Sequence, residues 1–326
     1  MKAPRRDKPD MLISALVCTR NRPADAERAV RSLLASHGVD LELVVVDQSD
    51  DDETRRRLAA LGDARVRLVR ATPAGKPSAL NKGLEVVASS IVVITDDDCE
   101  VPPGWVAGMA RELQARPHVG LVFSNVVAAS YDRRRGYVPT YERRRDREVH
   151  SIWGTCAGRG LGAAMAVRRD AVRALGGFDE AVGPGARFRS ADDWDLELRL
   201  LLSGWHIYES ADLWVVHHGF RSFADGRRHS HANWYGMGAV CAKPVRAGHP
   251  TAVGLGVWEL VAHAAAPAVA DLLSLRRPHG LGRIPAFCRG FFRGLTTDVD
   301  RAHLLYREAS GVGHPVAVEA EGHALR

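Results

Sequence analysis

Residues 91–98 read IVVITDDD, and this short stretch decides the fold class. Five consecutive β-branched residues are typical of a strand that is buried on both faces of a sheet. The three acids directly behind it exceed the single carboxylate that capping a following helix would need. In open parallel sheets functional groups gather beyond the carboxyl ends of the strands, so the stretch predicts a parallel sheet with a site at its edge.

Similar apolar runs lie on both sides of this stretch, separated by segments whose apolar residues recur at helical spacing. We expect strands at residues 11–18, 41–46, 66–69 and 120–123, and helices at residues 24–36, 52–61 and 78–88. Short buried strands that alternate with helices predict a mostly parallel sheet covered on both faces. The fold class is therefore α/β, a three-layer sandwich, and after residue 225 the sequence predicts a helical extension.

The composition excludes several classes of protein. Of the 326 residues, 46% are hydrophobic and 26% are charged, which predicts a sizeable core and excludes a disordered or collagen-like chain. The net charge of +6 favours anionic substrates or a membrane surface, and we expect no nucleic acid partner because such binders carry a denser basic patch. Five scattered cysteines without a CxxC motif predict reduced thiols and a cytoplasmic location.

Two segments bear on membrane association. Residues 1–10 are basic but are followed by a strand-length apolar run, which is too short for a signal peptide. Residues 251–275 are apolar but contain Glu259, His263, Pro267 and Asp271, so we expect no membrane span. Residues 276–293, which follow this apolar segment, contain five arginines. The two segments together are compatible with peripheral binding to the anionic inner face of a membrane. The alternative is a helical appendage packed on the main domain or on a second subunit.

Acids also follow the second expected strand, where residues 47–52 read DQSDDD. Carboxylates that converge from two strand ends repel one another, and a bound divalent cation removes that repulsion. Oxygen ligands suit Mg²⁺ or Mn²⁺, which keep positions open for phosphate oxygens. Acidic clusters of this kind also occur in phosphatases and nucleotidyltransferases, so the cluster alone does not name a substrate.

Five blocks narrow the choice: LISALVCTRNRP (12–23), LELVVVDQSDDDET (41–54), GKPSALNKGL (75–84), VVITDDDCEVPPGW (92–105) and GGFDEAVGPGARFRSADDWDLELRLLLSGW (176–205). In these blocks and in their order, the sequence resembles the family 2 glycosyltransferases. These are inverting enzymes of GT-A fold that use nucleotide-sugar donors. The resemblance covers residues 12–220, about two thirds of the chain.

The resemblance implies a role for each matching position. Asp96 and Asp98 form the family's Asp-X-Asp element, which binds Mn²⁺ or Mg²⁺, and His217 or His218 is a further candidate ligand. Asp193 takes the place of the catalytic base, beside Asp192 where the family normally has Glu. The implied donor-binding residues are Thr19, Asn21, Asp47, Lys76, Asn81 and Asp97.

Most of these positions have an ordinary structural alternative. Asp47 can cap a helix, Lys76 can be a solvated loop charge, and Asn81 can lie on a helix surface. The acids at 192–195 precede an amphipathic segment, where a helix dipole alone favours one carboxylate. His217 and His218 can be purely structural.

Two further segments have no assigned partner. The small side chains of residues 160–165 leave room for a sugar or an acceptor near the backbone, or for a tight packing contact. Residues 131–148 contain seven arginines and four acids, and form either a solvated excursion or a flexible basic loop over an anionic ligand.

The resulting hypothesis is a metal-dependent inverting glycosyltransferase that moves one sugar from a nucleoside-diphosphate sugar to an acceptor hydroxyl. A lipid-linked acceptor is left open. The Gln-X-X-Arg-Trp signature of processive synthases is missing, which favours single-sugar transfer. One alternative is a sugar-phosphate nucleotidyltransferase, although the glycine-rich loop typical of those enzymes is not found after residue 18. Another is a non-catalytic anion- or lipid-binding protein.

The predicted organisation follows from these assignments. We expect a flexible N-terminus at 1–10 and a catalytic domain at 11–224, with a nucleotide-binding half (11–125) and an acceptor half (126–224). A helical C-terminal region at 225–315 and a flexible tail at 316–326 complete the chain.

Overall fold

The computed structural model describes residues 11–72, 75–276, 278 and 280–307, and the predicted flexible ends at 1–10 and 316–326 lie outside these ranges. Its centre is a nine-stranded sheet in the order β3-β2-β1-β4-β9-β6-β10-β5, with β8 paired to β10. The strands are β1 (Leu12–Thr19), β2 (Asp40–Asp47), β3 (Val66–Arg70), β4 (Ile91–Asp96), β5 (Cys99–Glu100), β6 (Val119–Ala128), β8 (Arg147–Val149), β9 (Ala164–Arg168) and β10 (His206–His217).

The sheet is mostly parallel, as predicted. Strands β1 to β4 run in one direction, and β9 lies antiparallel between β4 and β6. Strand β10 is parallel to β6, so the carboxyl ends of β1, β4 and β10 point to the same edge of the sheet. The strands expected in the first 95 residues and at 120–123 are all present, whereas β5, β8, β9 and β10 are not predicted by the sequence patterns. The short segment AMAVR of β9 carries no strong strand signal of its own.

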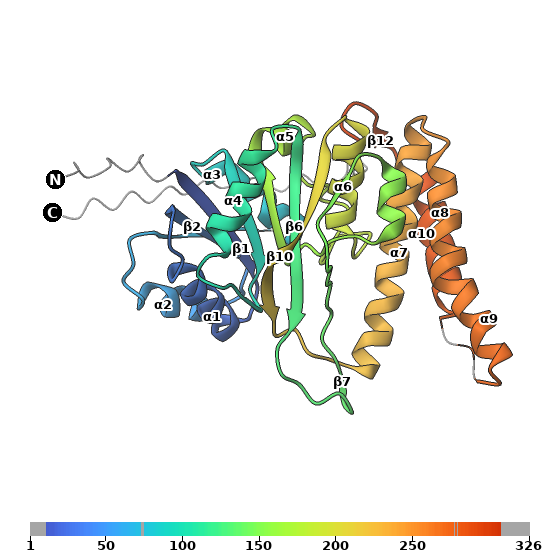
Figure 1. Ribbon diagram of the computed structural model, residues 1–326, viewed down its shortest axis with the longest axis horizontal. Helices are drawn as coiled ribbons and strands as arrows, with labels where there is room; N and C mark the ends of the chain where they lie inside the picture. The colour runs from blue at the N-terminus through green and yellow to red at the C-terminus, as the bar shows by residue number, and fades with distance from the viewer. Residues whose placement is uncertain (1–10, 73–74, 277, 279, 308–326) are drawn as a thin grey trace.

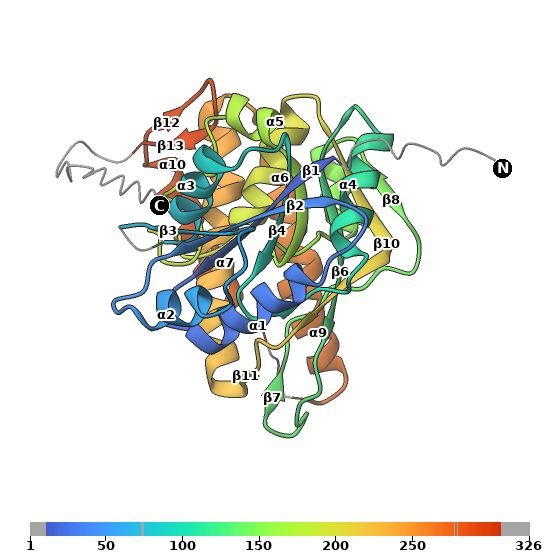
Figure 2. The ribbon, with the colours of Figure 1, turned by 90° about the vertical axis from the view of Figure 1, so that its left-hand side faces the viewer.

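Helices cover both faces of the sheet, which confirms the three-layer arrangement (Figures 1 and 2). On one face, α1 (Pro23–Leu34), α2 (Glu53–Ala59) and α4 (Trp105–Ala115) pack on alternate residues of β1, including Ile13 and Val17. On the other face, α3 (Lys76–Val86), α5 (Arg169–Ala174) and α6 (Asp192–Leu202) share a core with Leu16. Side chains alternate across a strand, so each strand contributes to both layers.

The C-terminal region is helical, as expected, and lies beyond α6 on one face of the sheet (Figures 1 and 2). It contains α7 (Phe223–Ala247), α8 (Ala252–Leu260), a π-helical turn (Val261–Ala265), α9 (Ala266–Leu273) and α10 (Arg283–Leu295). Residues of α7 such as Trp234 and Val240 belong to the same core as Leu196 of α6. The region is thus packed on the sheet domain through a continuous hydrophobic core.

The continuous helix Ala252–Leu273 is long and apolar enough to cross a membrane, and 33% of its most apolar window is buried within the protein. The acids taken above as evidence against a span do not face outward, because Glu259 and Asp271 are both buried. The outward face carries Val257, Val261 and Leu273. The helix therefore separates a charged inner face from an apolar outer one.

The arginine-rich segment at residues 131–148 is held to the rest of the protein at two places. Strand β7 (Gly136–Tyr137) pairs with β11 (Arg221–Ser222). At the returning limb, Arg147 binds the buried Glu209 through two hydrogen bonds of 2.6 and 2.7 Å. The remaining short elements are a 3₁₀ helix (Ile152–Ala157) and the strands β12 (Val299–Asp300) and β13 (Leu305–Tyr306).

Candidate active site

The three acids at the end of β4 have partly different partners, with Arg22 shared by Asp97 and Asp98. Asp96 pairs with Lys76 at the start of α3, with 2.5 Å between Oδ1 and Nζ. Asp97 turns inward and accepts hydrogen bonds from Thr19 (2.8 Å) and Arg22 (3.1 Å). Burial raises the pKa of Asp97 to about 6, although Arg22 and Thr19 act in the opposite direction. Asp97 is therefore the most buried of the three acids, and Asp96 and Asp98 are the more exposed ones.

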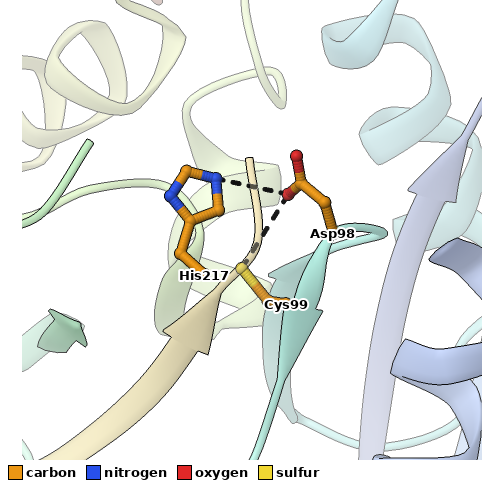
Figure 3. Close-up of side chains that lie close together, drawn as sticks. All are labelled: Asp98, Cys99 and His217. Atoms are coloured by element: carbon orange, nitrogen blue, oxygen red, sulfur yellow. Dashed lines mark hydrogen bonds and ion pairs between the residues drawn. The ribbon is translucent and has the colours of Figure 1, made fainter. Parts of the chain in front are cut away.

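Asp98 faces His217, the last residue of β10, with 3.4 Å between Oδ1 and Nε2 (Figure 3). The other ring nitrogen of His217, Nδ1, lies 2.9 Å from the carbonyl oxygen of Pro139. That contact orients the ring and leaves Nε2 directed at Asp98. His218 points elsewhere and pairs with Glu100 at 2.7 Å. Of the two histidines, the structure places His217 beside the acids.

The Asp98–His217 pair fits a divalent cation. A Cβ atom at Gly219 would lie 2.4 Å from His217 Nε2 and 2.8 Å from Asp98 Oδ2, so only glycine keeps the space at these two atoms free. Carboxylate oxygen and imidazole nitrogen are suitable ligands for Mn²⁺. Cys99 lies near the pair, 4.0 Å from Asp98, but burial raises the pKa of its thiol well above the usual value. A protonated thiol is a poor ligand.

A second acidic pair opens α6. Asp193 accepts a hydrogen bond from the backbone N–H of Gly162 at Oδ2 (2.9 Å) and one from Trp194 at Oδ1 (2.8 Å). Its side chain remains partly exposed. Ala191, just before the helix, adopts a left-handed backbone conformation (φ 73°), which turns the chain sharply into α6. The carboxylate of Asp193 is thus held in one orientation with one side open to solvent.

Asp192 is the buried member of this pair. Burial raises its pKa to about 7; the nearby Lys76 charge opposes this shift and the Asp193 carboxylate adds to it. The carboxyl group of Asp192 can therefore hold a proton near neutral pH.

Lys76 connects the two acidic groups. Burial alone would lower the pKa of Lys76, but the charges of Asp96 and of the 192–193 pair raise it above its ordinary value. The ammonium group is therefore bound to the end of β4 and within electrostatic range of the start of α6. Sequence positions about one hundred residues apart meet at one site.

The loops after β1 and β2 are joined to one another. Asn21, in a left-handed conformation (φ 55°), exchanges hydrogen bonds with Asp50 through both atoms of its amide (2.7 and 2.9 Å). Asp47 is buried at the end of β2 and accepts a hydrogen bond from the backbone of Ser49. The two joined loops lie next to Thr19, the last residue of β1.

Asn81 lies away from the acids. Its Oδ1 accepts from the backbone N–H of Phe178 (2.7 Å), and its Nδ2 donates to the carbonyl of Phe178 and to Glu180. The amide thereby clamps α3 to the segment that leads into α6. Its observed contacts are those of a structural residue.

Sequence reasoning missed three members of the site. Arg22 binds both Asp97 and Asp98, at 3.1 and 3.3 Å. Gly162 holds Asp193 through its backbone, and Gly219 leaves room beside His217. Arg22 lies within a quoted block, but one arginine in an arginine-rich chain gives no signal. The small residues at 160–165 had been noted without a partner.

Glu197, one turn beyond Asp193, is fully buried, and neither of its carboxyl oxygens has a hydrogen-bond partner among the described residues. Burial raises its pKa from 4.5 to about 8. Above pH 4.5 the unfolded chain releases this proton while the folded chain keeps it. We therefore expect the free energy of unfolding to fall between pH 5 and pH 8 by on the order of a few kcal/mol.

Glu197→Gln should remove this part of the pH dependence and raise stability at pH 8. Urea denaturation at pH 5 and pH 8 measures it, with the exposed Glu142→Gln as the matched control. Equal pH dependence in the Glu197 and Glu142 variants would show that Glu197 is charged in the folded protein.

Comparisons with known proteins show the family and the fold. The model of the family described as "Glycosyl transferase family 2" matches residues 14–176, half of the chain. Among solved structures, the chain resembles the mannosyltransferase PcManGT of Pyrobaculum calidifontis in complex with GDP-Man and Mn²⁺ (TM-score 0.59, 21% identity, 90% of this chain and 89% of that one). It also resembles S. aureus TarS 1–349 in complex with UDP (TM-score 0.53, 16% identity, 71% and 65%). These likenesses show a GT-A-like fold.

Curated relatives match shorter stretches. The uncharacterized protein MT1568 of Mycobacterium tuberculosis is 32% identical over 114 residues, which is 35% of each chain. The succinoglycan biosynthesis protein ExoO of Rhizobium meliloti is 33% identical over 117 residues (35% of this chain, 33% of ExoO). The glucosyl-dolichyl phosphate glucuronosyltransferase of Haloferax volcanii is 25% identical over 188 residues (53% and 58%). The matches thus span from a third to three fifths of these relatives. The family match, the fold and the arrangement of acids lead to one conclusion: the chain belongs to glycosyl transferase family 2, a family of glycosyltransferases.

Proposed function

We propose that this protein is a metal-dependent inverting glycosyltransferase that moves one sugar from a nucleoside-diphosphate sugar to an acceptor hydroxyl. The observation that carries the proposal is the ion pair of Lys76 with Asp96 at the end of β4, with the Asp192–Asp193 pair of α6 near enough to act electrostatically on the same ammonium group. A cation-binding edge and a candidate base thereby border one site. The neighbours solved with GDP-Man and with UDP support a nucleotide-sugar donor.

The donor's parts are assigned to different residues. Thr19, Asn21 and Asp47, at the ends of β1 and β2, would border the nucleoside. Lys76 and the half-exposed Arg22 supply positive charge for the diphosphate. Asp97 holds Thr19 and Arg22 in place by accepting a hydrogen bond from each of them. Asn81 holds the 178–180 segment in position.

Asp193 is the proposed general base. Its carboxylate removes the proton from the acceptor hydroxyl while that oxygen attacks the anomeric carbon on the face opposite the leaving group. A single displacement inverts the configuration at that carbon. The backbone N–H groups of Gly162 and Trp194 keep the carboxylate in position. The neighbouring Asp192 has a pKa of about 7, so its protonation state sets the negative charge next to Asp193.

Asp96, Asp98 and His217 are the proposed ligands of Mn²⁺ or Mg²⁺. When bound, such an ion offsets the negative charge that develops on the leaving diphosphate. The neighbour that contains Mn²⁺ supports this choice. Lys76 and Arg22 add fixed positive charge at the same edge.

Product analysis separates the candidate reactions. With a panel of nucleotide sugars and Mn²⁺, we expect release of UDP or GDP, and no release after the metal is removed with EDTA. Pyrophosphate release from a sugar phosphate and a nucleoside triphosphate would instead indicate a nucleotidyltransferase. Nucleoside diphosphate release that persists in EDTA would contradict the metal assignment. A binding protein would release neither product.

We further propose that the C-terminal helices bind the anionic inner face of a membrane and bring a lipid-linked acceptor to the site. The outer face of the 252–273 helix exposes Val257, Trp258 and Leu273, with exposed fractions of 54%, 46% and 82%. Arg276, Arg289 and Arg293 are exposed nearby in the sequence. Apolar side chains flanked by arginines match an anionic lipid surface.

Flotation with anionic and neutral liposomes tests this proposal. We expect the protein to float with anionic vesicles at low salt, and Trp258→Ser combined with Leu273→Ser to abolish flotation. Since each exposed apolar side chain contributes about 1.5–3 kcal/mol when buried in lipid, the double variant should bind at least about tenfold more weakly. No flotation of the wild-type protein would rule out this membrane contact.

A further inference from the structure

A cluster of three histidines and one glutamate lies at the edge of the sheet opposite the acids. It consists of His118 before β6, Glu148 in β8, His150 directly after β8 and His206 at the start of β10. His206 and His217 are the first and last residues of the 12-residue β10. The paired residues of β6, Val119 and Ala128, are nine positions apart, so the cluster is roughly 30 Å from the proposed donor site.

We propose that His118, Glu148, His150 and His206 form a binding site for a divalent transition-metal ion, with Zn²⁺ the best match. Three imidazoles and one carboxylate form a complete four-ligand set for Zn²⁺. This proposal is independent of the glycosyltransferase activity.

The ligand atoms already converge on one point. Glu148 Oε1 lies 2.8 Å from His118 Nε2, 2.7 Å from His206 Nδ1 and 3.7 Å from His150 Nδ1. The two Nδ1 atoms of His150 and His206 lie 3.1 Å apart. Ligand atoms around a tetrahedral Zn²⁺, with bonds of about 2.0–2.1 Å, are separated by about 3.3 Å. Small rotations of these side chains would therefore admit the ion.

The backbone explains why these side chains meet. Strand β8 pairs antiparallel with β10, with Glu148 opposite Tyr208 and Val149 opposite Ile207. Alternate residues of a strand project to one face, so Glu148, His150 and His206 share a face. The backbone N–H of His206 donates to the carbonyl of His118 at 3.0 Å, which fixes the third segment.

The cluster is accessible from solvent, since the side chains of His118 and His150 are 52% and 63% exposed. An ion bound there would join the turn before β6, the returning limb of the arginine-rich excursion and the start of β10. It would stabilise the folded protein because these segments are brought together only by folding.

Co²⁺ and Zn²⁺ titrations of tag-free, metal-free protein test the site. We expect one Co²⁺ per chain to give the intense visible absorption bands of a four-coordinate nitrogen-rich site, in addition to any Co²⁺ bound at the proposed donor site, and Zn²⁺ to displace it with a Kd of about 1 µM or tighter. Zn²⁺ should also raise the melting temperature. His206→Ala should weaken Zn²⁺ binding at least about 100-fold and remove the bands. His118→Gln, which changes a side chain that is 52% exposed, should do the same if His206→Ala is poorly folded.

Two controls make the result decisive. His249→Ala, which removes an exposed histidine outside the cluster, should leave the bands unchanged. His217→Gln, which alters the proposed donor site, should leave them unchanged as well. Absence of four-coordinate bands in the wild type, or bands that persist in both cluster variants, would show that the four side chains form only a hydrogen-bonded network.

Discussion

Asp193→Asn is expected to lower turnover by at least about 10²-fold while donor binding is retained. The amide is nearly isosteric with the carboxylate, and its oxygen can still accept the hydrogen bond from Gly162. It cannot accept the proton of the acceptor hydroxyl, so the proton-transfer contribution is lost. The amide nitrogen replaces the oxygen that accepts from the Trp194 N–H, so that hydrogen bond is lost as well. Nucleoside diphosphate release measures turnover, and the thermal shift produced by the nucleotide sugar measures donor binding.

Asp170→Asn is the matched control for this variant, because Asp170 is a carboxylate on α5 whose side chain is 82% exposed. It should behave as the wild type in both assays. Turnover of Asp193→Asn within a few fold of that control would remove Asp193 from the mechanism. Loss of donor binding in Asp193→Asn would indicate that this carboxylate holds the donor instead of activating the acceptor.

Lys243→Met should lower the free energy of unfolding by about 3–5 kcal/mol. Lys243 of α7 is 1% exposed, and its ammonium group binds two buried carboxylates, Asp179 and Asp195. Methionine fills a similar volume but leaves both acids in the core, where Asp195 keeps only its ion pair with Arg199. An uncompensated buried charge is strongly destabilising, so urea denaturation should show a clear loss.

The control is Lys82→Met on α3, where the lysine forms an exposed pair with Glu85. This change should alter stability by less than about 1 kcal/mol. Adding Asp179→Asn to Lys243→Met should recover part of the loss, because it removes one of the unpaired charges. Equal stability of the two lysine variants would mean that the buried acids become protonated without consequence.

The sheet could be predicted from the sequence to the extent that each strand carried its own signal. The β-branched run of β4 and the apolar runs of β1 and β2 are continuous because both faces of these strands are buried. Strand β9 is different: Ala164–Arg168 is short, and it becomes a strand only because β4 and β6 pair with it on either side. A pairing between distant segments leaves no local pattern.

The residues of the candidate site also fall into those that the sequence predicts and those that it does not. Acids that directly follow strands, such as Asp96 and Asp98, could be found because position in the chain already determines the edge of the sheet. Arg22, Gly162 and Gly219 could not, because their roles depend on which loops meet in space. Asn81 is the opposite case. It lies in a block that the sequence analysis recognised and assigned to the donor, yet its amide holds the 178–180 segment.

The packing of the C-terminal region was also beyond sequence reasoning. Glu259 and Asp271 looked like interruptions of an apolar helix, yet Glu259 forms a buried ion pair with Arg159. Arg159 belongs to the same loop as Gly162, which holds Asp193. The charge of Glu259 would be unfavourable in lipid. It is instead paired on the inner face of the helix, next to the loop that holds Asp193.

The central claim is that the acids after β4 hold a cation that recruits the diphosphate of the donor. Its most direct test is the melting temperature of the wild-type protein and of Asp98→Asn with a panel of UDP- and GDP-sugars, with and without Mn²⁺. The account predicts that at least one nucleotide sugar stabilises the wild type only when Mn²⁺ is present, and that Asp98→Asn loses this stabilisation. Equal stabilisation without Mn²⁺, or full retention in Asp98→Asn, would contradict it.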